Sequence, residues 1–319
     1  MDKKIKFGNS TLEIAPIVFG GNVFGWTLDE QASFRILDQF VDLGFDAIDT
    51  ANNYAHWVPG NVGGESETII GNWLAQRGGR DKVIVMTKVG GRFGYDTAPN
   101  VKAEYIKEQV EHSLRRLRTD YIDLYQTHYD VEETPVEETL RAYDDLIKAG
   151  KVRHIGTSNM SPERIVESLA VSAEKGLPAY VSLQPEYNLF DRAKYENLYR
   201  DLALEKKLAV IPYYALASGF LSGKYKNDND FEQSARGGGI KKNYWNERGK
   251  NIVAALEKVA SSHQTSMSAV ALAWLLAQDS ITAPIVSGTK DSHLQAFVEA
   301  ADLRLSNDEL QMLDEASAY

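Results

Sequence analysis

The sequence predicts a (β/α)8 TIM barrel, an α/β fold in which eight parallel strands alternate with helices. Short apolar or β-branched runs alternate with segments of helical period along the 319 residues, and these runs number eight. No G-x-G-x-x-G motif follows the first run, where the competing architecture, a doubly wound dinucleotide-binding sheet, would carry it. Periodicity alone does not separate the two architectures, so the count and the missing motif favour the barrel.

The predicted strands have apolar, largely β-branched centres. In chain order they are Ile14–Gly20, Ala47–Thr50, Val83–Val89, Ile122–Thr127, His154–Ser158, Tyr180–Gln184, Ala209–Tyr214 and Ala283–Ser287. Ahead of them, Lys4–Phe7 and Thr11–Ile14 are joined by Gly8-Asn9-Ser10, which predicts a β-hairpin. We expect this hairpin to plug the bottom of the barrel.

The segments between the strands carry helix signals. Apolar residues at helical spacing form one face at Ile106, Val110, Leu114 and Leu117, and another at Val136, Leu140, Tyr143 and Ile147. Capping boxes are predicted at Thr27 with Glu30, at Thr134 with Pro135 and Glu137, and at Ser306 with Glu309. Ser161-Pro162 predicts a cap followed by a proline at the first helical position, and Gly44, Gly150 and Gly176 are predicted helix ends.

One connection is unusually long. After the seventh strand, a polar, glycine-rich loop extends from Leu221 to the neighbourhood of Asn251, and loops of this length are commonly functional lids. It leads into an extra predicted helix at about residues 246–262, ahead of the barrel's own seventh helix at Met267–Gln278. No internal repeat or linker divides the sequence, so we expect residues 1–319 to form a single barrel domain.

Composition excludes several classes of function. The net charge of −10 and the pI of about 5.2 disfavour nucleic acid and anionic membranes as partners. The absence of cysteine excludes disulfides, thiolate chemistry and cysteine-based metal sites. The charged N-terminus, Met1–Lys6, is not followed by an apolar leader, and the most apolar run, Met267–Ala277, is too short to span a bilayer. These features predict a soluble, cytoplasmic protein and leave a small molecule as a possible ligand.

Four residues with complementary chemistry follow three consecutive predicted strands. Asp49 lies at the end of the second strand, and Tyr54 lies in the loop five residues further on. Lys88 and His128 lie at the ends of the third and fourth strands. Because the carboxyl ends of parallel barrel strands meet at one rim, we expect these four side chains to converge.

Together these groups can protonate a carbonyl oxygen. A tyrosine ordinarily titrates near pH 10, and an adjacent ammonium such as that of Lys88 lowers its pKa. A buried lysine needs a counter-ion, which Asp49 supplies, and His128 can hold the substrate oxygen or relay a proton. Taken singly, an Asp at a strand end is usually a helix cap and a Tyr is usually a core residue. The four residues together favour the functional interpretation.

The surrounding motifs resemble those of the aldo-keto reductases. These motifs are Asp-Thr-Ala-x-x-Tyr at 49–54, Thr-Lys at 87–88, Gln-x-His at 126–128, Gly-x-Ser-Asn at 156–159, the segment 63–67 with Ile70-Gly71, and the segment 215–225. The family consists of (β/α)8 barrels that reduce carbonyl compounds with NAD(P)H. The resemblance covers nearly the whole chain and implies that Asp49, Tyr54, Lys88 and His128 form the catalytic tetrad. The long loop and its extra helix resemble the branch that contains bacterial reductases and potassium-channel β subunits.

The resemblance also implies cofactor contacts. Ser158, Asn159 and Gln184 would bind the nicotinamide carboxamide, Tyr213 would stack on the nicotinamide ring with Tyr214 as the alternative, and the pyrophosphate would lie against Leu216, Ser218, Gly219, Leu221 and Lys224. The adenosine phosphate would meet Ser287, Gly288, Thr289 and Lys290. His293 and Phe297 stand where members that hold NADP tightly often carry an arginine and an asparagine. Lys290 is a single cation rather than a bidentate clamp, so NADPH is favoured and NADH is the alternative. Arg236 in the long loop is a further candidate phosphate contact.

The substrate pocket would be bordered by aromatic residues. Trp26 follows the first strand, Trp57 and His56 follow Tyr54, and Tyr129 follows His128. Aromatic walls suit an aldehyde or ketone with an apolar or sugar-like body. Asp130 either favours a hydroxylated or cationic group on the substrate or is a solvated loop acid.

The prediction is therefore an NAD(P)H-dependent carbonyl reductase that converts an aldehyde or ketone to an alcohol reversibly, with hydride from the nicotinamide C4 and Tyr54 as the general acid. The alternative is a redox-sensing regulatory subunit that binds NADP(H) and turns over slowly. A third class, a metal-dependent lyase or hydrolase, would need His and carboxylate ligands clustered at strand ends. Only His128 and His154 lie within or directly after predicted strands, and His154 begins its strand at the opposite rim, so no metal site is predicted.

Overall fold

The computed structural model of the chain describes residues 4–93, 97–233 and 236–319. Its strands are β1 Ile5–Lys6, β2 Glu13–Ile14, β3 Val18–Gly20, β4 Ala47–Asp49, β5 Ile84–Val89, β6 Ile122–Thr127, β7 Val152–Ser158, β8 Ser182–Gln184, β9 Ala209–Val210 and β10 Ile285–Val286. Its α-helices are α1 Glu30–Asp42, α2 Glu65–Arg77, α3 Ala103–Leu117, α4 Val136–Lys148, α5 Pro162–Lys175, α6 Ala193–Leu198, α7 Arg200–Lys206, α8 Gly237–Tyr244, α9 Glu247–His263, α10 Met267–Leu276, α11 Asp291–Asp302 and α12 Asn307–Ala316. Short 3₁₀ helices occur at η1 Gly21–Val23, η2 Arg80–Lys82, η3 Ala217–Ser222 and η4 Asp228–Gln233. The charged N-terminus considered above begins with Met1–Lys3, which lie outside the described residues.

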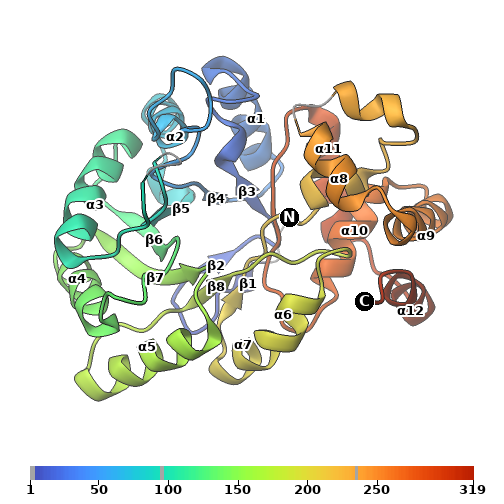
Figure 1. Ribbon diagram of the computed structural model, residues 1–319. Helices are drawn as coiled ribbons and strands as arrows, with labels where there is room; N and C mark the ends of the chain where they lie inside the picture. The colour runs from blue at the N-terminus through green and yellow to red at the C-terminus, as the bar shows by residue number, and fades with distance from the viewer. Residues whose placement is uncertain (1–3, 94–96, 234–235) are drawn as a thin grey trace.

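The predicted barrel is confirmed. Eight strands form one parallel sheet in the order β10-β3-β4-β5-β6-β7-β8-β9, and helices surround it (Figure 1). The two edge strands approach each other, because the backbone N–H groups of Thr282 and Ile285 donate to the carbonyls of Val210 and Pro212 at 2.9 Å. These bonds curl the sheet into a barrel whose strand ends share one rim.

The predicted strand positions are confirmed, although most strands are shorter than expected. The segment Ile14–Gly20 is divided, because Ile14 ends β2 and β3 begins only at Val18. Pro16 lies between them, and Pro212 and Pro284 likewise lie just beyond β9 and just before β10. Proline has no N–H to donate to a neighbouring strand, so ladder pairing stops beside each of these residues.

The N-terminal hairpin closes one end of the barrel, as predicted. β1 and β2 pair antiparallel, and Phe7, Leu12 and Ile14 pack with the inward-facing side chains of the barrel strands. Gly8 has a φ of +55°, and a Cβ there would lie 2.5 Å from the carbonyl oxygen of Val181. The turn therefore fits only because it is glycine.

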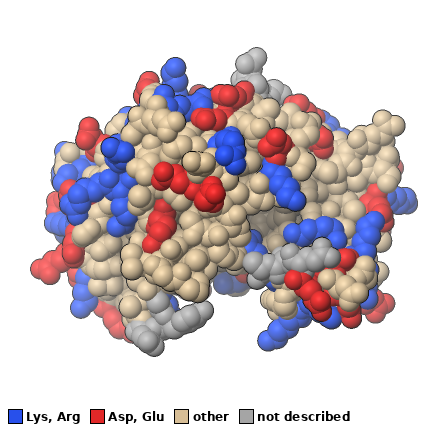
Figure 2. Space-filling view, turned by 90° about the horizontal axis from the view of Figure 1, so that it is seen from above, with Lys and Arg blue, Asp and Glu red and all other residues tan. Residues whose placement is uncertain are grey.

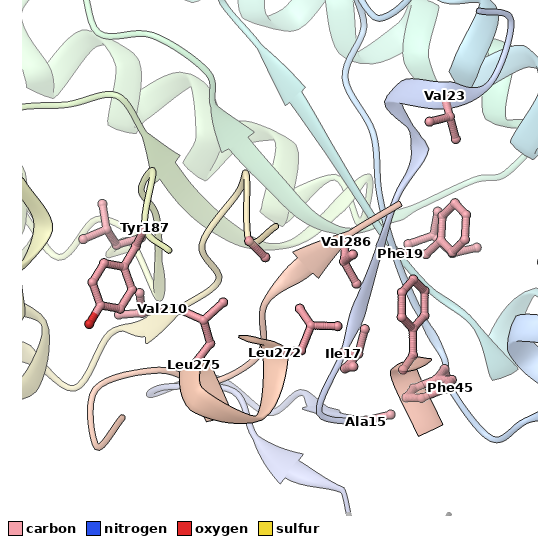
Figure 3. Packing of buried hydrophobic residues seen from close by; sticks show 14 of the residues in the cluster. Ala15, Ile17, Phe19, Val23, Phe45, Tyr187, Val210, Leu272, Leu275 and Val286 are labelled. Carbon is pink, nitrogen blue, oxygen red and sulfur yellow. The ribbon is translucent and has the colours of Figure 1, made fainter. Parts of the chain in front are cut away.

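A second apolar layer lies between the strands and the helices (Figure 3). Phe19 of β3 and Val286 of β10 lie in the same cluster as Leu272 and Leu275 of α10 and as Phe45 ahead of β4. Burying each such side chain stabilises the fold by about 1.5–3 kcal/mol. This packing holds the strands in register, and the strand ends in turn place the functional side chains.

Two of the predicted helix starts are wrong and two are confirmed. The capping box at Ser306 and the cap at Ser161 are present. α1 begins after Asp29, whose carboxylate accepts from Ala32 N, because a backbone turn still occupies Thr27. α4 begins at Val136 without a side-chain cap, since Pro135 keeps an extended conformation. Both errors arise from local backbone turns ahead of the helix.

The segment after β9 contains more helix than predicted. The extra helix is confirmed as α9, but the expected glycine-rich loop also contains α8. A Cβ on Gly237 would lie 1.7 Å from the carbonyl oxygen of Phe231, so this glycine permits close packing rather than a loose loop. The ring of Tyr244 in α8 stacks on that of Phe220, 5.6 Å away.

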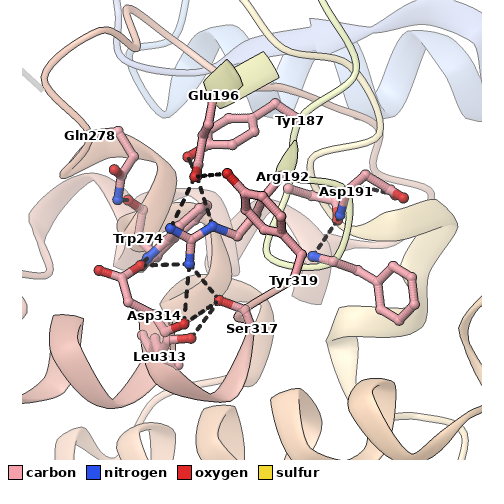
Figure 4. A network of polar contacts seen from close by, with 12 residues as sticks. Tyr187, Asp191, Arg192, Glu196, Trp274, Gln278, Leu313, Asp314, Ser317 and Tyr319 are labelled. Atoms are coloured by element: carbon pink, nitrogen blue, oxygen red, sulfur yellow. Dashed lines mark hydrogen bonds and ion pairs between the residues drawn. The ribbon is translucent and has the colours of Figure 1, made fainter. Parts of the chain in front are cut away.

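The C-terminal helix is tied to the barrel by a polar network (Figure 4). Arg192 donates to Glu196 at 2.7 Å, to Asp314 at 2.9 Å and to Ser317 at 2.7 Å. Its guanidinium also lies over the ring of Trp274. Across the ranges that the structure describes, no helix has the length and apolarity that crossing a membrane requires.

Candidate active site

Lys88 is the centre of the predicted cluster. It lies near the end of β5 with no exposed surface. Its ammonium donates to Asp49 Oδ2 at 2.5 Å, to the carbonyl of Thr50 at 2.8 Å and to the hydroxyl of Tyr54 at 2.9 Å. An ammonium has three N–H donors, so each has an acceptor. The structure thus brings Asp49, Tyr54 and Lys88 together as expected.

Asp49, at the end of β4, has both carboxylate oxygens in hydrogen bonds. Oδ2 accepts from Lys88, and Oδ1 accepts from the side-chain amides of Gln126 at 3.0 Å and Gln184 at 2.9 Å. Gln184 also donates to Gln126 Oε1 at 3.1 Å. Both amide hydrogens of Gln184 are therefore used inside the barrel, and only its side-chain oxygen is left to meet a ligand. The sequence showed Gln126 only as part of a motif and did not indicate this supporting role.

Burial is the main cause of the pKa shifts of Lys88 and Tyr54. It lowers the pKa of Lys88, against the opposing effect of Asp49. Burial also raises the pKa of Tyr54 well above its ordinary value, and the charge of Asp49 raises it further. The sequence predicts that the ammonium lowers the pKa of Tyr54; the net direction is the reverse, because burial disfavours the charged phenolate. Tyr54 consequently keeps its proton at neutral pH.

His128 lies on the other side of Tyr54. It directly follows β6, and its ring centroid is 6.0 Å from that of Tyr54 at an interplanar angle of 71°. Burial lowers the pKa of His128 well below its usual range, and Lys88 and His56 lower it further. This direction favours the neutral imidazole at neutral pH, a protonation state that the sequence left open.

The predicted aromatic border is present beside Tyr54. Trp57 packs edge-on against Tyr54 at 6.0 Å and against Trp26 at 5.7 Å, and the ring of Tyr129 lies 4.8 Å from that of His128. Trp57 and Tyr129 are exposed, so they form an outer border rather than core.

Neither of the two predicted roles of Asp130, a substrate-binding acid or a solvated loop acid, fits its contacts. Its carboxylate accepts from Arg164 Nε at 2.9 Å, and the side chains of both residues are largely buried. It is neither a solvated loop acid nor an open acceptor for a substrate. His56 is likewise engaged, with Nδ1 2.7 Å from the carbonyl oxygen of Asn53.

The ends of β7, β8 and β9 meet next to His128. Ser158 Oγ donates to the carbonyl of Gln184 at 2.8 Å. Asn159, with a φ of +48°, donates to the carbonyl of His128 at 3.0 Å and accepts from the hydroxyl of Tyr213 at 3.1 Å. Asparagine tolerates this left-handed conformation better than most residues. These residues therefore form a hydrogen-bonded polar group beside the predicted tetrad.

The segment after β9 has the geometry of an anion site. Ala217, Ser218 and Gly219 have φ values of +47°, +58° and +95°. The position of a Cβ on Gly219 lies 3.4 Å from Lys224 Nζ, so the lysine side chain covers this backbone. Backbone turned in this way beside a lysine suits a phosphate oxygen. Leu216 accepts the backbone N–H groups of Gly219 at 2.8 Å and Leu221 at 3.2 Å, which keeps the turn tight.

The turn after β10 carries Lys290, a second cationic residue beside the predicted cofactor site after Lys224. Ser287 Oγ lies 2.7 Å from the carbonyl oxygen of Gly20, which joins this turn to the end of β3. Gly288 separates it from Thr289, whose backbone N–H donates to His293 Nδ1 at 3.1 Å. Burial lowers the pKa of His293, and the charges of Lys290 and Lys224 lower it further, so the two lysines lie near the same imidazole. Seen from above, the surface is hollowed beside a group of Lys and Arg side chains (Figure 2).

Arg236 connects the long segment to the aromatic border. Its guanidinium lies over the ring of Trp26, 4.6 Å from the centroid. Burial lowers the pKa of Arg236, while the phenols of Tyr214 and Tyr225 raise it. The segment after η4 therefore reaches across to the loop that follows β3.

One supporting cluster was not anticipated from the sequence. Thr87, next to Lys88, donates to Glu67 Oε1 at 2.5 Å, and Arg116 Nε donates to Glu67 Oε2 at 2.7 Å. Glu67 has no exposed surface, and it holds α2 and α3 against β5. Its place in the 63–67 motif was the one signal available in the sequence.

The described part of the chain contains no set of ligands for the metal ion that a metal-dependent lyase or hydrolase would need. Within it, no group of three or more His, Cys, Asp or Glu side chains lies close enough to hold a metal ion. His154, at the opposite end of the barrel, instead contacts Thr11 Oγ1 of the hairpin at 2.9 Å.

Comparison with known proteins gives one consistent assignment. The model of a family described as "Aldo/keto reductase family" matches residues 16–318. The oxidoreductase YrpG of Bacillus subtilis (strain 168) is 33% identical over 97% of this chain and 94% of its own length. Aldo-keto reductase YhdN of the same organism is 32% identical over 94% of this chain and 87% of its own length. An aryl-alcohol dehydrogenase of Phanerodontia chrysosporium, named for NADP(+), is 29% identical over 97% of this chain and 84% of its own length.

Proposed function

The chain belongs to the aldo/keto reductase family, and from that premise we propose that it reduces an aldehyde or ketone to an alcohol with NADPH. That it is an NAD(P)H-dependent oxidoreductase follows from the family and its relatives. One observation carries the more specific proposal. A fully hydrogen-bonded Lys88 joins the carboxylate of Asp49 to the phenol of Tyr54, with a neutral His128 on the far side.

Each residue of this group has a distinct part in the proposed reaction. Tyr54 donates its hydroxyl proton to the carbonyl oxygen, and its high pKa guarantees that the proton is present at neutral pH. Lys88 stabilises the phenolate that remains, through the hydrogen bond already formed at 2.9 Å. Asp49 keeps Lys88 charged in a buried site, and His128 orients the carbonyl oxygen. A bound reduced nicotinamide supplies the hydride to the carbonyl carbon. In the reverse direction, the phenolate of Tyr54 accepts the proton of the alcohol.

The residues after β7, β8, β9 and β10 suit NADPH. Asn159 and Tyr213 are linked by a hydrogen bond where the nicotinamide would lie, with Ser158 and Gln184 next to them. The turn at Gly219 and Lys224 would hold the pyrophosphate. The charges of Lys290 and Lys224 both act on His293, and Lys290 with His293 would meet the 2′-phosphate that distinguishes NADPH from NADH. A relative named for NADP(+) supports this preference, and NADH is the alternative.

Aromatic side chains support a carbonyl substrate with an apolar, aryl-like body. Trp26, Trp57 and Tyr129 border Tyr54 and His128, and a planar ring can stack among them. Two relatives are named for aromatic alcohol oxidation and for norsolorinic acid reduction. Asp130 has no part in this recognition, since Arg164 holds it.

Replacing Tyr54 by Phe tests the proposal. The variant loses the acid but keeps the ring, so kcat for aldehyde reduction should fall by about 10²–10⁴ while the dissociation constant for NADPH stays unchanged. Tyr121→Phe is the matched control, because it removes a phenol hydroxyl at the opposite end of β6. Wild-type turnover in Tyr54→Phe would contradict the assignment. Very slow turnover by the wild type with a cofactor that does not exchange would instead support the regulatory alternative.

A further inference from the structure

The two nitrogens of His128 lie in different environments. Nδ1 is buried and has no hydrogen-bond partner among the described residues. The residue as a whole is only half-buried, so Nδ1 faces the protein and Nε2 faces the open rim. A neutral imidazole has one N–H and one lone pair, and the partner of the inner nitrogen decides which of them meets the substrate.

The inner nitrogen and the side chain of Asn53 both lie beside the backbone of Gly91. A Cβ added at Gly91 would lie 2.5 Å from Asn53 Nδ2 and 2.6 Å from His128 Nδ1. The amide and the imidazole therefore converge on one point, which is open only because residue 91 is glycine. Asn53 lies in the loop after β4, next to Tyr54, and is 5% exposed.

The orientation of the Asn53 amide is determined by another contact. Nδ2 donates to the carbonyl oxygen of Arg92 at 2.7 Å, whereas Oδ1 has no partner among the described residues. An amide turned the other way would set an oxygen against that carbonyl, so the nitrogen must face Arg92. A primary amide nitrogen carries two hydrogens, and one of them is still available.

We propose that Asn53 is a positioning residue that presents its second amide hydrogen to His128 Nδ1, directly or through one water, and so holds the imidazole proton on Nε2. The proton on Nε2 then points into the rim, where it donates to the substrate carbonyl oxygen next to the hydroxyl of Tyr54. With the opposite tautomer, a lone pair would face the carbonyl oxygen and repel it. The inference deepens the proposed function and rests on it for its catalytic consequence.

Asn53→Asp tests the proposal directly. The substitution keeps the shape of the side chain and puts a carboxylate acceptor where the amide donor was. We expect the His128 proton to move toward Nδ1 and kcat to fall about ten- to a hundred-fold, somewhat less than the 10²–10³ typical of removing an oxyanion donor. KM and the dissociation constant for NADPH should change little, because the side chain of Asn53 is buried.

The tautomer is read by NMR on protein labelled with nitrogen-15 histidine and loaded with NADP(+). His128→Gln identifies the resonances of His128 among the six histidines. Asn52→Asp is the matched control, since Asn52 is also buried but its amide donates to Gln109 at 3.1 Å. A wild-type His128 with its proton on Nδ1, or an unchanged tautomer in Asn53→Asp, would overturn the proposal.

Gly91→Ala provides a second route if Asn53→Asp does not fold. Its methyl group would occupy the point where the amide and the imidazole meet, and we expect the same loss of the Nε2–H tautomer. An unchanged tautomer in this variant would also count against Asn53. The NMR measurement needs no turnover. A wild type without reductase activity would therefore refute the proposed function, while the tautomer of His128 would still decide the role of Asn53.

Discussion

Replacing Asp49 by Asn should disable the site although the two side chains have the same shape. Asp49 Oδ2 accepts from Lys88 at 2.5 Å, while Oδ1 accepts from two glutamine amides. An asparagine can place its oxygen toward only one of these sides. Its NH2 group must then face either the ammonium of Lys88 or the amide donors of Gln126 and Gln184. Every orientation leaves buried donors facing each other.

The magnitude follows from burial. The side chains of Lys88 and Asp49 are 0% and 2% exposed, so solvent does not screen the pair. Removing one partner of such a buried pair costs about 3–5 kcal/mol of folding free energy. Asp145→Asn is the matched control, because Lys107 and Asp145 are also 2.5 Å apart but are 46% and 58% exposed. An exposed pair contributes about 0–1 kcal/mol.

Catalysis should respond through the charge of Lys88. The pKa of Lys88 is already lowered by burial, and Asp49 is the main group that opposes this. Without Asp49 the pKa falls further, so the lysine loses its proton at a lower pH and no longer stabilises the phenolate of Tyr54. We expect kcat for aldehyde reduction to fall by about 10²–10⁴. Any remaining alkaline limb of the kcat profile should shift to lower pH.

Two measurements decide this prediction. Urea unfolding gives the stability difference, and steady-state kinetics across pH give the shift of the alkaline limb. Asp49→Asn with the urea midpoint of the wild type, or with an unshifted alkaline limb, would refute the reasoning about the buried pair.

Two further predictions concern the cofactor site and the C-terminal helix. Lys290→Ala should raise the dissociation constant for NADPH about ten-fold while leaving that for NADH within about two-fold, because one cation contributes roughly 1–1.5 kcal/mol to binding a partly exposed phosphate. Fluorescence titration with both cofactors checks this prediction. Equal weakening of NADPH and NADH binding would show that Lys290 does not bind the 2′-phosphate. Arg192→Ala should lower the free energy of unfolding by about 2–4 kcal/mol, since Glu196 and Asp314 both lose a charged donor. Urea unfolding checks the second prediction, and a loss below about 1 kcal/mol would mean that the network in Figure 4 is only a surface contact.

Much of the fold and site could be predicted because their signals are local. The strand ends at Asp49, Lys88 and His128 are visible as apolar runs that stop at a polar residue, and parallel strands place such ends on one rim. The hairpin and the extra helix α9 were likewise predicted from local turn chemistry and periodicity. α8 was not, because glycines usually indicate a loop, and only the contact with Phe231 explains why Gly237 begins a helix.

The sequence by itself determined which chemical groups gather at the rim, because residue type and strand register are properties of the chain. Only the tertiary structure decided how those groups behave. The pKa of Tyr54 is raised rather than lowered, since burial and the charge of Asp49 both act on the phenol, and burial depends on how much water packing removes. The amide of Gln184 donates to Asp49, and the amide of Asn53 and the imidazole of His128 both lie beside Gly91, because segments far apart in the chain meet there. Such distances arise from packing in three dimensions, and no local pattern encodes them.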